Sequence, residues 1–233
     1  MKALVYTGAE SLAYRDAPDA IAGDGEVAIR VGAVGICGSD MHAYLGHDNR
    51  RPAPLILGHE AAGVITGGPR DGERVTVNPL VTCGVCPACE SGRENLCPDR
   101  QIISMPPREG AFADIVTMPE RNLVRVPDYV SLEKAALAEP SAVSWHGVRL
   151  GLGALHEADA RRALVIGGGA IGVAAVLSLR AMGCDDVTVI EPNPTRRAYL
   201  SDNCGLDAAA ETTEAYPLVI DAVGFAVTRA NAS

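Results

Sequence analysis

Short runs of alternating hydrophobic and polar residues dominate the first part of the chain. The runs 26–32 (EVAIRVG), 73–79 (ERVTVNP) and 122–127 (NLVRVP) place apolar side chains at roughly every second position, and Gly and Pro separate them. A period of two is typical of strands with one buried face, and Gly and Pro end such strands. We therefore predict that residues 1–145 form a β-rich, barrel-like domain.

The pattern changes at residue 163. A continuous apolar run is followed by a glycine-rich turn and then by a helix of Ala, Val and Leu, which is typical of a buried parallel strand and its crossover. The predicted strands are 163–167, 186–190, 206–210 and 217–223, and a connecting helix is expected over 141–152. The fold class is thus a two-domain α/β protein, with a nucleotide-binding domain over 146–233.

Glycines stand at the start of this second domain in the pattern G-x-G-x-x-G. They permit a tight turn, a close approach of the backbone to a pyrophosphate, and close packing of helix on strand. Glu191, nineteen residues after the last of them, ends the next strand and can hold the ribose hydroxyls. The expected cofactor-binding residues are Gly167, Gly169, Ala170, Ile171, Gly172, Glu191 and Arg196.

An acid at this position favours NAD over NADP, because it repels a 2′-phosphate. Arg196 and Arg197 follow closely and keep NADP as an alternative. Asn193 and Pro194 suit a helix cap and first turn, so the simpler role of both arginines is a solvated helix surface. A glycine-rich loop without any ligand is the plain alternative for the whole motif.

Composition narrows the range of partners. The net charge is −9 and no basic stripe is present, which argues against nucleic acid as a partner. The N-terminus lacks the apolar region of a signal peptide and no stretch is long and apolar enough to span a membrane, so we expect a cytoplasmic protein with reduced thiols.

Four of the seven cysteines fall within fifteen residues: Cys83, Cys86, Cys89 and Cys97. A disulfide knot does not fit a reducing compartment, whereas four thiolates at this spacing suit a tetrahedral Zn²⁺ with no open position, that is, a structural site. An iron–sulfur cluster is the main alternative, because it uses similar ligands.

A second constellation consists of Cys37 in GICGSDMH (35–42), His59 in GHEAAGVI (58–65) and Glu139 in LAEPSAV (137–143). One thiolate, one imidazole and one carboxylate make three protein ligands, which leaves the fourth position of a catalytic zinc open for substrate. Taken alone, a lone cysteine and a lone histidine are more often ordinary core residues.

These motifs, the four-cysteine segment and GAFADIVTMPERNLVRVPD (110–128) occur in the order seen in zinc-dependent medium-chain dehydrogenases. The chain most resembles the sorbitol, threonine and polyol dehydrogenase branch. The resemblance implies a GroES-like β-barrel catalytic domain and a Rossmann domain. It makes Cys37, His59 and Glu139 ligands of a catalytic zinc, with Glu60 either a ligand in exchange with water or a group beside the ligands.

The resemblance also implies a reaction, namely hydride transfer between a polyol or secondary alcohol, or its carbonyl product, and NAD(P). Ser39 would begin the proton relay, His42 would continue it, and Asp40 would orient the zinc histidine. Capping of a turn by Ser39 and a surface role for His42 are the plain alternatives. The rival functions are a non-catalytic zinc- and nucleotide-binding scaffold and a zinc-free quinone reductase.

Only four strands are predicted in the second domain, whereas a full dinucleotide-binding sheet has six. We therefore expect either a fragment of a longer enzyme or a short form with compromised activity. In the full-length form the family suggests a homodimer or homotetramer that acts on a small-molecule alcohol or polyol.

Overall fold

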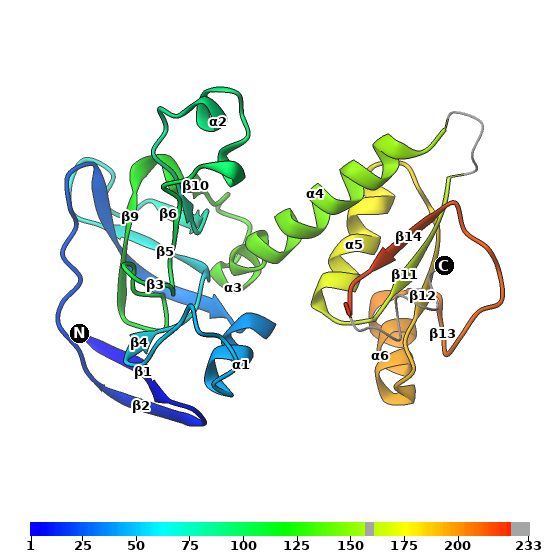
Figure 1. Cartoon of the computed structure of the whole chain (residues 1–233), viewed down its shortest axis with the longest axis horizontal. Coiled ribbons are helices and arrows are strands. Elements are labelled where there is room, and N and C mark those ends of the chain that lie inside the picture. Colours follow the sequence, from blue (N-terminus) through cyan, green and yellow to red (C-terminus); the bar gives the residue numbers. More distant parts are fainter. Residues whose placement is uncertain (157–160, 225–233) are drawn as a thin grey trace. The chain divides into compact units, whose positions relative to one another are not determined.

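The computed structural model of the chain describes residues 1–156 and 161–224. The structure divides into two compact units, one of Met1–Glu139 and one that begins at Pro140 (Figure 1). The predicted boundary between residues 145 and 146 and the observed one both fall inside helix α4 (Ala138–Ala154). A helix that runs through a domain boundary gives no composition change by which to locate it.

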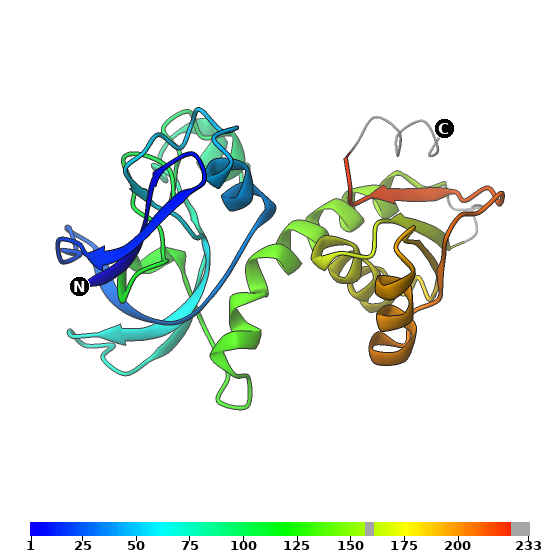
Figure 2. The same ribbon diagram turned by 90° about the horizontal axis from the view of Figure 1, so that it is seen from below.

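The first unit is built around a curled antiparallel sheet with the strand order β10-β6-β5-β3-β9 (Figure 2). Its strands are β3 (Glu26–Gly35), β5 (Glu60–Thr66), β6 (Arg74–Val77), β9 (Ile115–Pro119) and β10 (Leu123–Arg125). The register of β3 against β5 shifts between Val31 and Ala33, and such an irregularity bends a strand. Buried aliphatic side chains of these strands, among them Ile29 and Ile65, form the core. This is the β-rich, barrel-like domain that the alternating runs predict.

Smaller elements complete the first unit. A second antiparallel sheet has the order β2-β1-β4, and β7 pairs with β8. The helical elements are α1, α2 and α3, with two short 3-10 turns, η1 and η2. The bounds are β1 (Lys2–Gly8), β2 (Ser11–Asp16), β4 (Leu55–Ile56), β7 (Leu80–Val81), β8 (Gln101–Ile102), α1 (Gly38–Tyr44), α2 (Pro87–Glu90), α3 (Leu132–Ala136), η1 (Glu94–Leu96) and η2 (Glu120–Asn122).

The second unit contains a parallel sheet with the order β13-β12-β11-β14. Its elements are β11 (Arg162–Ile166), α5 (Ala170–Ala181), β12 (Asp186–Ile190), α6 (Pro194–Cys204), β13 (Ala208–Ala209) and β14 (Leu218–Asp221). When the four strands are numbered along the chain from β11, their spatial order is 3-2-1-4. This is the start of the doubly wound dinucleotide-binding sheet. The prediction of a Rossmann-type domain is confirmed.

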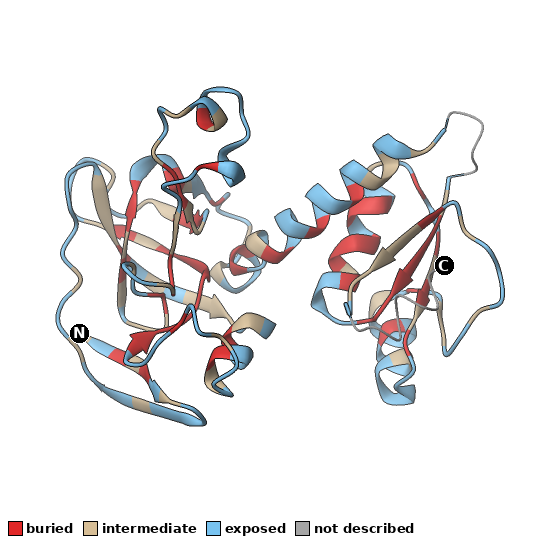
Figure 3. Ribbon diagram, in the orientation of Figure 1, coloured by how far each residue is buried: buried red, intermediate tan, exposed pale blue. Residues whose placement is uncertain are grey.

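Burial explains why the apolar runs form this sheet. Strand β11 and the inner face of α5 are buried, whereas the outer face of α5 is exposed (Figure 3). Val165, Leu179 and Val189 lie together in one core cluster with Val148 of α4. Asn193 caps α6 by accepting a hydrogen bond from the Arg196 backbone N–H at 3.1 Å, as its sequence predicts.

Among the described residues, no helix combines the length and the apolar character needed to cross a membrane.

Candidate metal and nucleotide sites

Three donor side chains meet where helix α1 begins and strand β5 begins. Cys37 is the N-cap residue of α1, Glu60 is the first residue of β5, and His59 immediately precedes that strand. Gly58, just before them, has φ +90°, a conformation that favours glycine. Gly35, opposite Glu60 in the β3–β5 ladder, leaves space for its carboxyl, because a Cβ there would lie 2.1 Å from Glu60 Oε2.

The donor atoms of Cys37, His59 and Glu60 all lie within 4.8 Å of one another. His59 and Glu60 are each 7% exposed, whereas Cys37 is half-buried, so water reaches the group mainly at the Cys37 side chain. Glu139 does not belong to this close group, but its carboxyl is near enough to interact electrostatically with His59 and Glu60. The structure thus places Glu60, rather than Glu139, directly beside Cys37 and His59.

The charges of this site are coupled. A hydrogen bond with His59 lowers the pKa of the Cys37 thiol. Burial acts to lower the pKa of His59, but Asp40 and Cys37 outweigh it and raise that pKa to about 10. Burial raises the pKa of both carboxyls, Glu60 and Glu139. The titrations of the thiol, the imidazole and the carboxyls in this site therefore depend on one another.

Asp40 is 3% exposed and ties the site together. Its carboxylate accepts hydrogen bonds from the backbone N–H groups of Cys37 (3.0 Å) and Gly58 (3.2 Å), and its Oδ1 lies 3.6 Å from Nδ1 of His59. Ser39 acts, after His59, to lower the pKa of the Cys37 thiol. His42, by contrast, lies on an exposed part of α1 with its ring centroid 6.4 Å from that of His47.

The donor set fits a zinc ion. Sulfur, nitrogen and oxygen donors of these three types are those that catalytic zinc sites use. Nδ1 of His59 faces Asp40, which leaves Nε2 for a metal, and this is the usual arrangement of a metal-binding histidine with its outer partner. Cys37, His59 and Glu60 would hold the ion, and its positive charge would balance the buried anions.

The four-cysteine segment forms a separate lobe. Cys83, Cys86, Cys89 and Cys97 bring their sulfurs within 4.8 Å of one another, and all four are free thiols. Gly84 (φ +79°) and Gly92 (φ +72°) turn the backbone so that this is possible. Backbone N–H groups, chiefly that of Val85, lower the pKa of the Cys83 thiol to about 7.

The sulfur spacing fits one metal ion. Cys86–Cys89, Cys83–Cys97 and Cys83–Cys89 have sulfur separations of 3.5, 3.6 and 3.9 Å. Four sulfurs about 2.3 Å from a tetrahedral zinc lie about 3.8 Å apart. An iron–sulfur cluster holds several irons and sulfides between its cysteines, which requires wider spacing. The spacing therefore favours zinc over the cluster.

The glycine-rich turn after β11 has a different constraint at each position. Gly167 has φ +99°, and a Cβ at Gly172 would lie 1.8 Å from the Gly167 carbonyl oxygen. Gly169 is the N-cap residue of α5, and no side chain of the described residues accepts a hydrogen bond from the first N–H groups of that helix. A Cβ at Gly169 would meet nothing within 4 Å. The turn thus leaves the N-terminus of a twelve-residue helix open to an anion. Ala170 and Ile171 form the first turn of that helix.

Glu191 directly follows β12 (Asp186–Ile190), lies beside this turn and is 2% exposed. Its carboxylate accepts hydrogen bonds from the N–H groups of Gly168 (3.0 Å) and Asn193 (2.9 Å) and from Arg196 Nη1 (2.9 Å). Burial acts to raise its pKa, but these hydrogen bonds outweigh burial and hold the pKa below its ordinary value. The predicted ribose-binding acid therefore lies at the glycine turn, with Arg196 paired to it.

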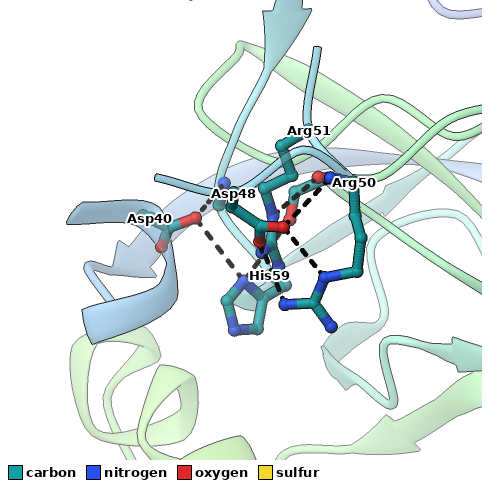
Figure 4. A network of polar contacts seen from close by, with 7 residues as sticks. Asp40, Asp48, Arg50, Arg51 and His59 are labelled. Atoms are coloured by element: carbon teal, nitrogen blue, oxygen red, sulfur yellow. Dashed lines mark hydrogen bonds and ion pairs between the residues drawn. The ribbon is translucent and has the colours of Figure 1, made fainter. Parts of the chain in front are cut away.

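Two residues near the first candidate metal site could not be predicted from the sequence. Ser104 is fully buried and its Oγ lies 3.5 Å from Nδ1 of His59. Arg51, buried at 4% exposure, donates from Nε to the Ser104 carbonyl at 3.0 Å and pairs with Asp48 (Figure 4). No local pattern marks either residue, because the contacts join segments 45 to 53 positions apart.

An antiparallel β domain with two candidate metal sites, followed by the start of a Rossmann-type sheet, is the architecture of the medium-chain dehydrogenases. Comparison with known proteins agrees. Residues 23–128 match the alcohol dehydrogenase GroES-like domain. The chain is 39% identical over 215 residues to sorbitol dehydrogenase of Bacillus subtilis (strain 168), covering 84% of this chain and 57% of that protein.

L-galactonate-5-dehydrogenase of Escherichia coli (strain K12) is 34% identical over 224 residues, covering 92% of this chain and 64% of that protein. Among solved structures, a short chain alcohol dehydrogenase from E. coli CFT073 complexed with NADH superposes with a TM-score of 0.84 at 28% identity, covering 100% of this chain and 72% of that one. The GroES-like match, these relatives and the NADH-complexed structure together support the zinc-type medium-chain alcohol and polyol dehydrogenase family for this chain. It spans about three fifths of the length of these two curated relatives.

Proposed function

We propose that this chain carries the metal site and the first half of the nucleotide site of a zinc- and NAD-dependent dehydrogenase of polyols or secondary alcohols. The observation that carries the proposal is the meeting of Cys37, His59 and Glu60 within 4.8 Å, with Asp40 behind His59. A scaffold protein needs only the four-cysteine lobe and has no use for this second donor set.

Bound zinc would lower the pKa of a substrate hydroxyl, and the nicotinamide of NAD would accept a hydride from the carbinol carbon. The products are a carbonyl compound, NADH and one proton. Cys37, His59 and Glu60 would hold the metal. Glu139, whose carboxyl interacts electrostatically with His59 and Glu60, is the further candidate ligand. Asp40 would fix the ring of His59. Ser39, two residues after Cys37, would take the substrate proton, and His42 is the predicted next group of the relay.

For the second unit we propose that Gly167, Gly169, Ala170, Ile171 and Gly172 hold the pyrophosphate at the N-terminus of α5 and that Glu191 holds the ribose. The buried carboxylate supports NAD over NADP. Arg196 pairs with the Glu191 carboxylate and neutralises part of its charge. We therefore expect the chain to prefer NAD but still to bind NADP weakly.

The four-cysteine lobe is proposed to hold a structural zinc. Its reduced thiols suit a cytoplasmic protein. The chain of which this sequence forms part is proposed to act on a small-molecule alcohol or polyol as a homodimer or homotetramer.

The experiment that tests the proposal compares Cys37→Ser with Cys204→Ser, a thiol on α6 outside both metal groups. Zinc is counted by mass spectrometry, and NADH formation is followed with a panel of polyols and secondary alcohols. We expect two zinc ions in the wild-type chain and in Cys204→Ser, and one in Cys37→Ser with no turnover. Unchanged zinc content and turnover in Cys37→Ser would refute the assignment.

A further inference from the structure

A buried network of polar side chains reaches the Nδ1 atom of His59. We propose that Ser104 and Arg51 are positioning residues for the metal-binding ring of His59, an inference that rests on the proposed zinc site. Neither residue has a place in the sequence motifs of the site.

Ser104 occupies a backbone position that suits glycine. It follows β8 in a turn closed by a hydrogen bond from the Met105 N–H to the Ile102 carbonyl at 3.2 Å, and its φ is +65°. A turn with positive φ at its third residue normally takes Gly or Asn. Strain of this kind in a buried residue points to a functional use of the side chain.

The hydroxyl of Ser104 supplies that use. The residue is fully buried, and its Oγ lies 3.5 Å from Nδ1 of His59, the ring atom that also faces Asp40 at 3.6 Å. Two oxygens from different segments thus flank the same nitrogen, which fixes the ring from two directions. A glycine would satisfy the turn but leave one of these directions open.

Arg51 holds Ser104 in place. Its Nε donates to the Ser104 carbonyl at 3.0 Å, while its guanidinium pairs with Asp48, and both side chains are below 9% exposed. The neighbouring Arg50 also binds Asp48, but its side chain is 70% exposed and it has no contact with Ser104 among the described interactions (Figure 4). Adjacent arginines therefore share one carboxylate, and only the buried one reaches the turn.

The test measures zinc affinity rather than turnover. Ser104→Gly removes the hydroxyl and suits φ +65°, so the fold is expected to persist. Ser178→Ala is the matched control, because Ser178 is another buried serine, and its hydroxyl donates within α5 to the Ala174 carbonyl. Arg51→Lys loses the Nε donor, and Arg50→Lys is its matched control. Zinc is titrated against a chromophoric chelator, and the site of interest is the one that disappears in Cys37→Ser.

We expect Ser104→Gly to weaken zinc binding at that site by about 10- to 100-fold, the usual effect of removing an outer partner of a metal-binding histidine. Arg51→Lys should weaken it in the same direction, and both controls should bind as the wild type does. The ring-nitrogen NMR shifts of His59 in the zinc-loaded chain should move in Ser104→Gly and stay fixed in Ser178→Ala. A merely structural role for Ser104 would not produce that difference.

Two results would overturn the inference, and they are distinguishable. Wild-type zinc affinity and unchanged His59 shifts in Ser104→Gly would overturn the positioning role alone and leave the zinc site intact. Wild-type protein that takes up zinc only at the four-cysteine lobe would overturn the proposed function, and the inference with it.

Discussion

Replacing Gly172 by Ala is expected to disrupt the packing of α5 on β11. The new Cβ would lie 1.8 Å from the Gly167 carbonyl oxygen, at least 1.2 Å closer than real Cβ atoms are found to their neighbours. Neither partner can rotate away, because one is helix backbone and the other is the turn itself. Overpacking of this kind costs about 1–3 kcal/mol, and a backbone obstacle puts this case at about 2–3 kcal/mol.

Thermal unfolding followed by circular dichroism checks the size of the effect. For a unit of this length each kcal/mol lowers the melting temperature by about 4–8 °C, so roughly 8–24 °C is expected for Gly172→Ala. NAD affinity, measured by calorimetry, should fall in parallel, because the displaced helix no longer presents its N-terminus to the pyrophosphate.

Gly169→Ala is the matched control and should separate stability from binding. A Cβ there meets nothing within 4 Å, and φ −80° suits alanine. The weaker N-cap and the less flexible unfolded chain offset each other to within about 1 kcal/mol. The melting temperature should therefore stay close to wild type while NAD binding weakens at least tenfold, because the methyl group occupies the approach of the pyrophosphate. Equal melting temperatures in Gly172→Ala and Gly169→Ala would refute the reasoning.

The remaining predictions concern the metal sites and the buried acid. Gly35→Ala should remove the zinc ion held by Cys37, His59 and Glu60 and leave the four-cysteine zinc in place, because the new Cβ displaces the carboxyl of Glu60. Metal analysis of the purified variant measures this. Cys97→Ser should release the structural zinc and make the lobe sensitive to proteolysis, since that sulfur is fully buried. Glu191→Gln should destabilise the second unit near neutral pH, and the difference from wild type should shrink as the pH falls below the ordinary glutamate value of 4.5.

The sign of the pH effect follows from the direction of the shift. The folded chain holds the pKa of Glu191 below its unfolded value, so the carboxylate adds stability above that value and loses it as acid protonates the group. Denaturant midpoints at several pH values measure this. A difference that grows toward acid pH would contradict the explanation. For Gly35→Ala the control is Gly38→Ala, where a Cβ meets nothing within 4 Å, and loss of zinc in both variants would count against the proposed displacement.

The sequence alone was sufficient for the local elements and the class of fold. Alternation over 26–32 predicted β3, the apolar run at 163–167 predicted β11, and Asn193–Pro194 predicted the start of α6. These features follow from patterns of burial and capping among residues that are neighbours in the chain, so the sequence alone contains them. The four-cysteine lobe was predictable for the same reason, since its ligands are close in sequence.

Only the tertiary structure decided which donor side chains meet at the first candidate metal site. Cys37, His59 and Glu139 are far apart in the chain, and the resemblance left the place of Glu60 open; the β3–β5 pairing sets Glu60 directly beside Cys37 and His59. The contact of Ser104 with His59 could not be predicted from the sequence for the same reason. Its role depends on a buried turn that meets His59 across 45 residues, and contacts of that range are fixed by how the sheet closes and not by any local pattern of side chains.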